Sequence, residues 1–275
     1  MRFHKPLLTL TAALLVAACA TSPTGRKQLM LVSENQAISA SRQAYAQEMG
    51  KYQKEGKLVS DPKVLERVRK ITERLVAQAV KMRPDSAQWQ WSVQVIDDPK
   101  TVNAWCMAGG RMAIYTGLIL KVDPTDDELA QVMGHEIAHA LANHTAERMS
   151  TAMAANAGII AAGLMSDNPG QAMALAAAAA TVAIKLPNSR TSENEADQIG
   201  IELAARAGYD PRAAITLWQK MAKVGGGAPP EFLSTHPSDA TRQERLSALV
   251  PKMMPYYQAG GPRPTHPVLM GPKAV

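Results

Sequence analysis

The sequence contains few cysteines: Cys19 and Cys106 are the only two among 275 residues. If Cys19 carries lipid, as its surroundings indicate below, Cys106 has no intramolecular partner. A small secreted scaffold held together by disulfide bonds is therefore excluded, and the fold must depend on a packed core or on a metal ion. The mature chain, Cys19 to Val275, is long enough for one such core and short for two large domains.

Dense runs of lysine and arginine with interleaved aromatic residues are also missing. The formal net charge is +6, and two of these charges, Arg2 and Lys5, belong to the extreme N-terminus. Because the remaining basic residues form no concentrated patch in the sequence, nucleic acid is not an expected partner. A mild positive balance suits a protein that works close to anionic lipid.

No apolar run is long enough to span a bilayer. The segment Leu7–Ala18 is apolar or nearly so, but a spanning helix needs ~20 residues. A basic start precedes this segment and small residues follow it, so residues 1–18 are predicted to be a signal peptide. The alanine-rich stretch 152–186 is interrupted at 166–170, and each half is again too short. A pair of close-packed helices is expected there.

The residues Val16-Ala17-Ala18-Cys19 resemble the bacterial lipobox, in which the cysteine is diacylated and becomes the new N-terminus. Two acyl chains hold a protein durably on a membrane, whereas one does not. Ala20 follows the cysteine in place of aspartate, which by analogy with enterobacterial sorting favours the outer membrane. We therefore expect a periplasmic lipoprotein anchored through Cys19, with residues 19–32 as its tether. The alternative is an ordinary signal peptide with an incidental cysteine.

Hydrophobic periodicity predicts an α+β fold that is mostly helical and carries one small sheet. Strands are expected near 89–95, 102–107 and 111–115, and helices at 33–54, 62–83, from the Thr125-x-x-Glu128 capping box through about Met149, and at 192–207, 211–223 and 238–250. Residues 33–250 should form the single folded domain. Six prolines from Pro251 onward predict an extended tail over 251–275.

The sequence His135-Glu136-Ile137-Ala138-His139 carries the chemistry. On a helix, residues four apart lie on one face, so both imidazoles can bind the same metal ion. Glu136 lies at the edge of that face and can accept a proton from a water molecule held by the metal without being a ligand. The chain has only six histidines, so a coincidental pair of surface histidines is the weaker alternative. One catalytic zinc ion per chain is predicted.

A catalytic zinc site needs a third protein ligand. The segment Ser192–Asp197 supplies carboxylates on a predicted helix, where Glu193 and Asp197 share a face and Glu195 points elsewhere. One carboxylate can bind zinc while another accepts a hydrogen bond from a ligand histidine. Periodicity alone does not choose between Glu193 and Glu195. The alternative is a solvated acidic helix start, which the helix dipole favours.

The HEIAH motif, the Glu193–Asp197 segment, Ser234-Thr235-His236-Pro237 and Arg242 occur in the order that is typical of metallopeptidase family M48. The sequence resembles this family, the group of the CAAX-prenyl proteases, HtpX and the periplasmic protease BepA. The resemblance also covers Gly25–Leu29 and Asn103-Ala104, so it extends over nearly the whole mature chain.

The resemblance implies a zincin-like protease with a defined set of site residues. Zinc would be bound by His135, His139 and Glu193, with Glu136 as general base and Asp197 bonded to a ligand. The edge strand of the small sheet would face the groove at the zinc site and pair with the substrate backbone; its residues are Asn103, Ala104 and Trp105. The chain has no room for tetratricopeptide repeats after the protease, unlike BepA, and no membrane helices, unlike HtpX. Unfolded or misassembled envelope proteins are therefore the expected substrates.

His236 and Arg242 leave alternatives open. His236 is a candidate fourth ligand that would displace the water and make the enzyme latent, or it packs the loop, or with Arg242 it stabilises the oxyanion. A different function is a lipoprotein chaperone or assembly factor whose zinc is structural, since structural sites are closed by four ligands. The presence of Glu136 favours the enzyme, because a structural site has no use for a base. His144 and Cys106 are expected to be packing residues.

Overall fold

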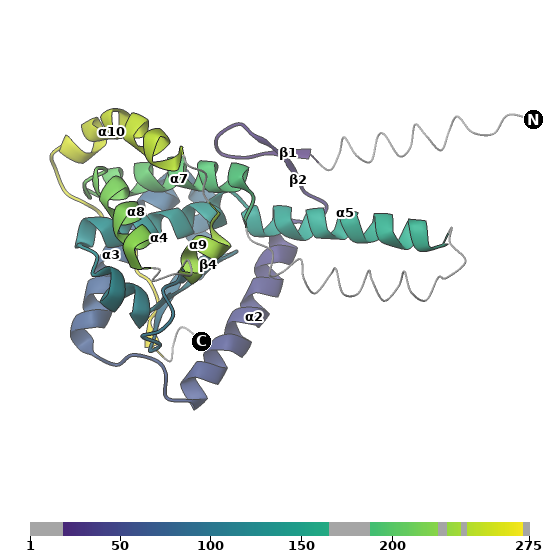
Figure 1. The fold of residues 1–275 in the computed structure, drawn as a ribbon, viewed down its shortest axis with the longest axis horizontal. Coiled ribbons are helices and arrows are strands. Elements are labelled where there is room, and N and C mark those ends of the chain that lie inside the picture. Colours follow the sequence, from purple (N-terminus) through teal and green to yellow (C-terminus); the bar gives the residue numbers. More distant parts are fainter. Residues whose placement is uncertain (1–18, 165–187, 225–229, 238–240, 272–275) are drawn as a thin grey trace, which may run out of the picture. The chain divides into compact units, whose positions relative to one another are not determined.

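The structure is a computed structural model that describes residues 19–164, 188–224, 230–237 and 241–271 (Figure 1). The chain divides into two compact units, a small unit of residues 1–37 with 143–186 and a main unit of residues 38–142 with 187–275. The predicted signal peptide and the second half of the alanine-rich stretch lie outside the described residues. Among the residues that are described, no helix combines the length and apolar character needed to cross a membrane.

The small unit contains an antiparallel ribbon and a helix. Strand β1 (Cys19–Thr21) pairs with β2 (Lys27–Leu29), and α5 spans His144–Leu164. The Arg26 guanidinium donates two hydrogen bonds to the Glu147 carboxylate, at 2.6 and 2.7 Å, and Gln28 donates a third at 2.9 Å. Burial raises the pKa of Glu147, but these donors outweigh burial and lower it. The predicted tether is therefore an ordered ribbon fixed to the first turns of α5.

The main unit is built on a three-stranded sheet with the order β3 (Ser92–Ile96), β5 (Arg111–Tyr115), β4 (Ala104–Met107). Strand β5 runs parallel to β3 and antiparallel to β4. The turn between β4 and β5 needs glycine, because Gly110 has φ +80° and a Cβ there would lie 2.5 Å from the Trp91 ring. This connection leaves β4 at one edge of the sheet.

The opposite edge of the sheet, along β3, is covered by other parts of the chain. Val59 N–H donates to Val95 C=O at 2.9 Å, and near the C-terminus Val93 N–H donates to Leu269 C=O at 2.9 Å. Leu269 N–H in turn donates to Trp91 C=O at 2.9 Å. Backbone groups of β3 are therefore paired on both sides, whereas β4 has β5 as its only strand partner in the described sheet.

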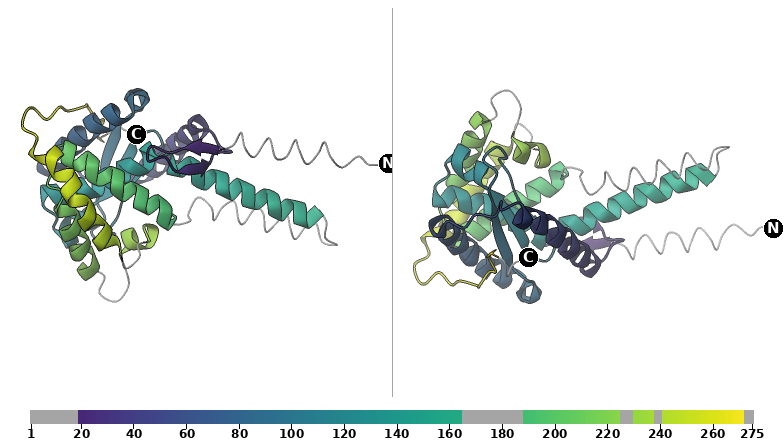
Figure 2. Two further views of the ribbon diagram at one scale, coloured as in Figure 1. Left: turned by 90° about the horizontal axis from the view of Figure 1, so that it is seen from above. Right: turned by 90° about the horizontal axis from the view of Figure 1, so that it is seen from below.

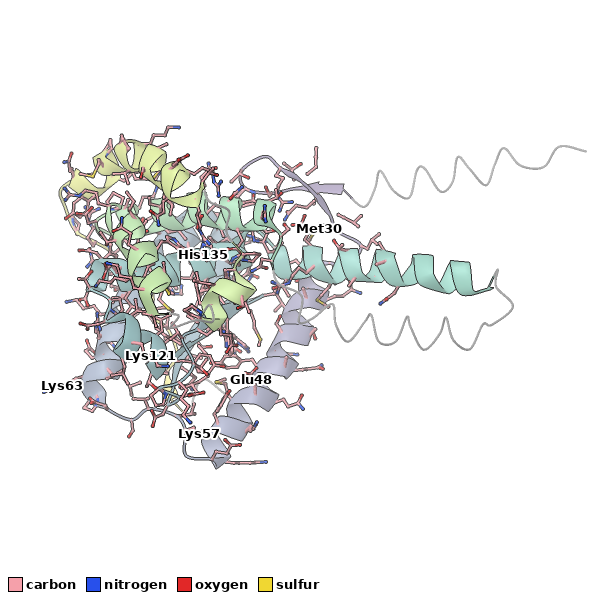
Figure 3. All side chains as sticks on the ribbon, viewed as in Figure 1. Met30, Glu48, Lys57, Lys63, Lys121 and His135 are labelled. Atoms are coloured by element: carbon pink, nitrogen blue, oxygen red, sulfur yellow. The ribbon has the colours of Figure 1, made fainter. Side chains whose placement is uncertain are left out.

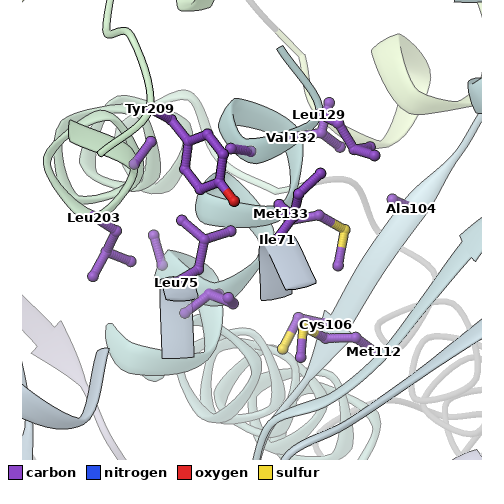
Figure 4. Close-up of a cluster of buried hydrophobic side chains, with 14 of the residues drawn as sticks. Ile71, Leu75, Ala104, Cys106, Met112, Leu129, Val132, Met133, Leu203 and Tyr209 are labelled. Atoms are coloured by element: carbon purple, nitrogen blue, oxygen red, sulfur yellow. The ribbon is translucent and has the colours of Figure 1, made fainter. Parts of the chain in front are cut away.

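Helices cover both faces of the sheet. On one face, α3 (Pro62–Met82) and α4 (Asp126–Leu141) form the main apolar core with α7 (Arg190–Arg206), and Figure 4 shows Ile71, Leu75, Val132 and Leu203 from these helices. On the other face, α2 (Glu34–Lys54) packs Tyr45 and Met49 against Ile96, Ala113 and Tyr115. The sheet thus forms a middle layer of the main unit.

The remaining elements of the main unit are α8 (Ala213–Val224), the short α9 (Glu231–Thr235), α10 (Arg242–Gln258), a turn of 3-10 helix, η1 (Pro84–Gln88), and a π-helical turn, η2 (Leu118–Val122). Helix α10 lies along α7, as the views of Figure 2 show. The predicted mostly helical α+β fold is confirmed.

Two predicted boundaries are wrong for local reasons. The helix from Thr125 was predicted to continue to about Met149, but it ends at Leu141 because Asn143 adopts φ +55°, a left-handed conformation that asparagine tolerates. The extended tail was predicted from Pro251, but α10 continues to Gln258 with Pro251 and Pro255 inside it. These prolines are four residues apart and both exposed, so their missing N–H groups fall on one solvent-facing side.

Candidate metal centre

Helix α4 presents both histidines of the HEIAH motif to one point. Its first turn is fixed by the predicted capping box, in which Thr125 Oγ1 accepts from Glu128 N–H at 3.2 Å and the Glu128 carboxylate accepts from Thr125 N–H at 2.8 Å. The Nε2 atoms of His135 and His139 are 3.1 Å apart. Both side chains are buried, and Figure 3 shows His135 among the helices of the main unit.

Helices α4 and α7 approach closely enough to bring their side chains together. A Cβ on Gly134 would lie 2.9 Å from Gly200 C=O, and a Cβ on Gly200 would lie 2.8 Å from His135 N. The two glycines therefore allow backbone contact at the crossing, one residue before the first histidine. A larger side chain at either position would separate the helix that carries the histidines from the helix that carries the acidic residues.

Helix α7 supplies two carboxylates to opposite sides of the His135 ring. The Glu193 oxygens lie 3.2 Å from His135 Nε2 and 3.3 Å from His139 Nε2. Asp197 Oδ1 lies 3.1 Å from His135 Nδ1. The structure thus distinguishes Glu193 from Glu195, which is also buried but lies outside the group of ligand atoms. The spacing argument that paired Glu193 with Asp197 agrees with this geometry.

His236, at the C-terminal end of α9, completes the group. Its Nδ1 lies 3.1 Å from Glu193 Oε1 and 3.2 Å from His135 Nε2. The Phe232 ring stacks on His236, with ring centroids 4.4 Å apart and an interplanar angle of 21°. His135, His139, Glu193 and His236 each offer one ligand atom, and these atoms all lie within 4.8 Å of one another.

The group fits a divalent cation such as zinc. Three imidazole nitrogens and one carboxylate oxygen are a donor set that zinc prefers. Burial lowers the pKa of His135, but the carboxylates of Glu193 and Asp197 outweigh burial and raise it to about 9. Oxygen Oε2 of Glu193 is buried without a hydrogen-bond partner among the described residues. The surroundings therefore favour a positive charge at this point, and a metal ion would supply it.

Glu136 lies beside the group without belonging to it. Its Oε1 is 3.4 Å from His236 Nε2 and has no hydrogen-bond partner in the described part of the chain. Burial raises the pKa of Glu136, although the neighbouring histidines and the backbone N–H of Cys106 oppose the shift. A carboxylate with increased proton affinity next to a metal ion can accept a proton from water.

Arg242 lies against the Nδ1 side of His135, with its Nη2 3.5 Å from His135 Nδ1 and 3.6 Å from Glu193 Oε2. It is 3% exposed, and its Nη2 donates to Asp197 Oδ1 at 2.6 Å, the same oxygen that lies next to His135 Nδ1. The guanidinium carbon is 3.5 Å from the centre of the Trp218 ring. This geometry lets Arg242 hold Asp197 and, through it, the His135 ring; its role as oxyanion stabiliser stays a prediction.

The predicted substrate strand lies directly beside α4. Asn103 Oδ1 accepts from Ala104 N–H at 2.9 Å, and Asn103 Nδ2 donates to Glu231 of α9 at 3.1 Å. The Trp105 ring points to the α2 face, where it meets Tyr45 edge-on at 5.8 Å. Burial raises the pKa of the Cys106 thiol well above its ordinary value, which agrees with a packing role for Cys106.

Three residues near the group were not identified from the sequence. Asn188 Nδ2 lies 3.5 Å from both His139 Nε2 and His236 Nδ1, Phe232 stacks on His236, and Trp218 packs on Arg242. No motif in the sequence connects Asn188 with a site, because its neighbours come from α4 and α9.

Comparison with known proteins agrees with this geometry. Residues 62–250, more than half of the chain, match the model of peptidase family M48. The chain belongs to this family. The M48 match confirms the predicted family, and together with the ligand group it supports zinc as the cofactor. His135, His139 and Glu193, with His236 as a fourth donor, are the residues that would hold the zinc ion.

Curated relatives of this M48 chain come from mitochondria and from bacteria. "Mitochondrial metalloendopeptidase OMA1" of Arabidopsis thaliana is 40% identical over 159 residues, which are 57% of this chain and 31% of the relative. Human "Metalloendopeptidase OMA1, mitochondrial" is 33% identical over 245 residues, 84% of this chain and 45% of the relative. "Beta-barrel assembly-enhancing protease" of Escherichia coli is 29% identical over 195 residues, 67% and 38% respectively. The chain thus spans half or less of these relatives.

Proposed function

We propose that this M48 chain is a zinc metalloendopeptidase that hydrolyses peptide bonds in misfolded or misassembled cell-envelope proteins. The observation that carries the proposal is the position of Glu136, a buried carboxylate beside four ligand atoms and outside their group. A purely structural metal site has no use for such a group. The names of the relatives, metalloendopeptidase and assembly-enhancing protease, support the same class of reaction.

Each residue has a defined part in the proposed mechanism. Zinc, when bound, supplies Lewis acidity that polarises a peptide carbonyl and lowers the pKa of water. Glu136 accepts the proton of the attacking water and passes it to the departing amine. Asp197 accepts a hydrogen bond from His135 Nδ1 and, with Arg242, fixes the orientation of that ring. The edge strand β4 aligns an extended substrate by backbone pairing.

Cleavage of an unfolded protein tests this proposal directly. Purified protein should cut casein, and a zinc chelator should stop cleavage, while mass spectrometry shows one zinc ion per chain. The chaperone alternative predicts the same zinc content without cleavage. Prevention of aggregation of an unfolded protein, unaffected by loss of proteolysis, would favour that alternative.

The position of His236 bears on how the activity is controlled. A fourth protein ligand takes the place that water needs on a catalytic zinc, so we propose that His236 is a latch that keeps the enzyme latent. Its Nδ1 is 3.1 Å from Glu193 Oε1, and its ring is stacked on Phe232. Helix α9 also contacts the strand β4 region, because Phe232 N–H donates to Val102 C=O at 3.1 Å.

His236→Ala is expected to raise casein cleavage several-fold while zinc remains bound through His135, His139 and Glu193. The reason is that removing the imidazole leaves room for water beside Glu136. Turnover and zinc content should be measured on the same preparation. If His236 instead stabilises the oxyanion, turnover should fall by on the order of a hundredfold at full zinc occupancy, and the latch would be refuted.

We further propose that the chain is a lipoprotein on the periplasmic side of a bacterial membrane, with the outer membrane favoured. The lipobox-like residues before Cys19 and the bacterial relatives support this location. The relatives named OMA1 are mitochondrial, so family membership alone does not choose the compartment. Cys19 is the first residue of β1, which the ribbon connects to α5.

Cys19→Ala is expected to release the mature protein from membranes, or to leave it uncleaved with its signal segment attached. Two acyl chains give durable anchoring, and their loss removes it. Cell fractionation and labelling with a radioactive fatty acid would measure both outcomes, with Cys106→Ala as the matched control. Unchanged labelling of the Cys19 variant would contradict the lipoprotein proposal.

A further inference from the structure

The most exposed large apolar side chain in the described residues belongs to Leu120, which is 64% exposed. It lies on the η2 turn between β5 and α4, whose neighbouring residues Leu118 and Val122 are buried. The turn is therefore fixed to the core on one side, while Leu120 points away from it. A single exposed leucine is ordinary, so its surroundings decide whether it has a function.

Lysines surround this turn. An open hollow of about 560 Å³ lies between η2 and the last turns of α8, and its lining includes Lys121, Lys220 and Lys223. Lys121 Nζ donates to the backbone carbonyl of Lys100 at 2.9 Å, so the backbone at Lys100 also lies next to η2. Figure 3 shows Lys121 on the near side of the main unit. We call the three lysines that line the hollow, together with Leu120, the lysine–leucine surface.

The carboxylates near this surface do not cancel its charge. Lys220 donates to Glu128 at 2.7 Å, so these two neutralise each other. Of the described residues that line the hollow, Asp123 is the one acidic residue. Lys121 and Lys223 therefore outnumber it, and both are exposed. The helix dipole stabilises lysines in the last turn of α8, which would by itself explain Lys223. It does not explain Lys121 or Leu120, which lie on η2.

We propose that the lysine–leucine surface docks on a membrane rich in anionic phospholipid. The ammonium groups would bind headgroup phosphates, and Leu120 would enter the boundary between headgroups and acyl chains. A free phosphate would need the lysines but not the exposed leucine. The surface is contained in the main unit, so the contact is separate from any lipid on Cys19.

A fluorophore at Leu120 tests the contact in the full chain. The variant Leu120→Cys would be labelled with an environment-sensitive dye, since the other described unmodified thiol, Cys106, is buried. With vesicles containing phosphatidylglycerol, the emission should shift to the blue and nitroxide lipids with shallow labels should quench it. Neither change should occur with pure phosphatidylcholine. Inorganic phosphate alone should leave the emission unchanged.

Charge variants of the labelled chain sharpen the test. Lys121→Gln with Lys223→Gln should raise the anionic lipid concentration needed for half the response by about 25-fold, because each lysine near such a surface contributes about a fivefold factor and the two factors multiply. Asp123→Asn should lower that concentration, and asparagine suits the left-handed φ of +45° there. Lys51→Gln with Lys54→Gln, both on the last turn of α2, is the charge-matched control.

Equal responses with the two kinds of vesicle would overturn the proposal, as would a response that the double lysine variant leaves unchanged. A response to inorganic phosphate without one to vesicles would assign the hollow to a free anion and overturn it too. The readout does not depend on proteolysis, so it stands or fails separately from the proposed enzymatic function.

Discussion

Glu136→Gln should reduce casein cleavage by between about a hundredfold and ten-thousandfold, the range that general acid–base catalysis contributes. Glutamine has nearly the same shape and can still accept the backbone N–H of Cys106 that the carboxylate faces. It cannot accept a proton from water. Zinc should remain bound, because Glu136 is not among the four residues that offer ligand atoms. Cleavage rate and zinc content measured together separate these effects.

The matched control for this experiment is Glu195→Gln. Glu195 is also buried, and it lies on α7 outside the group of ligand atoms. The same chemical change there should leave turnover within a few-fold of the unmodified protein. Appreciable cleavage by the Glu136 variant, in a preparation free of contaminating proteases, would refute its role as the base.

Glu193→Ala should lower zinc affinity by more than the ten- to hundredfold that loss of an outer-shell partner typically costs. Its carboxylate is the only acidic group among the four ligand residues, and it lies within 3.3 Å of both motif histidines. Glu195→Ala should leave zinc occupancy near normal. Competition with a chromogenic chelator would measure both affinities.

Folding must be checked because Glu193 is fully buried. Circular dichroism of the zinc-free variants would establish that α7 still packs on α4, and Glu193→Gln offers a second variant of nearly unchanged volume. If Glu195→Ala lost zinc while Glu193→Ala kept it, the assignment of the third ligand would be wrong by two residues along α7.

The sequence was sufficient to predict the parts of the site that depend on the spacing of residues within one helix. The four-residue interval between His135 and His139 fixes their common face, and the Thr125 capping box starts their helix where predicted. The choice of Glu193 over Glu195 depends on which side of α7 faces α4. That orientation follows from the contact at Gly134 and Gly200, a tertiary feature that periodicity within one helix does not contain.

Other features depended on interactions between distant segments. The sequence left the role of Arg242 open, because its partner Asp197 is 45 residues away in sequence and its position also depends on Trp218. The ends of α4 and α10 were missed for backbone reasons, a left-handed Asn143 and two exposed prolines. Propensities describe an average environment, and in each case the surrounding structure or solvent exposure outweighed them.

The covered β3 edge has a consequence for a protein that handles unfolded chains. Exposed strand edges can pair with extended segments of other chains without sequence selectivity, and they are common starting points of aggregation. Here Val59 and the C-terminal Leu269 form hydrogen bonds with backbone groups of β3. The β3 edge is therefore not available for pairing with a non-native polypeptide. Under the proposed mode of substrate binding, strand addition would then be left to β4, which has contacts with the helix of His135 and Glu136. The C-terminal residues, far from the chemistry in sequence, thus protect the proposed protease from becoming a template for the material that it would remove.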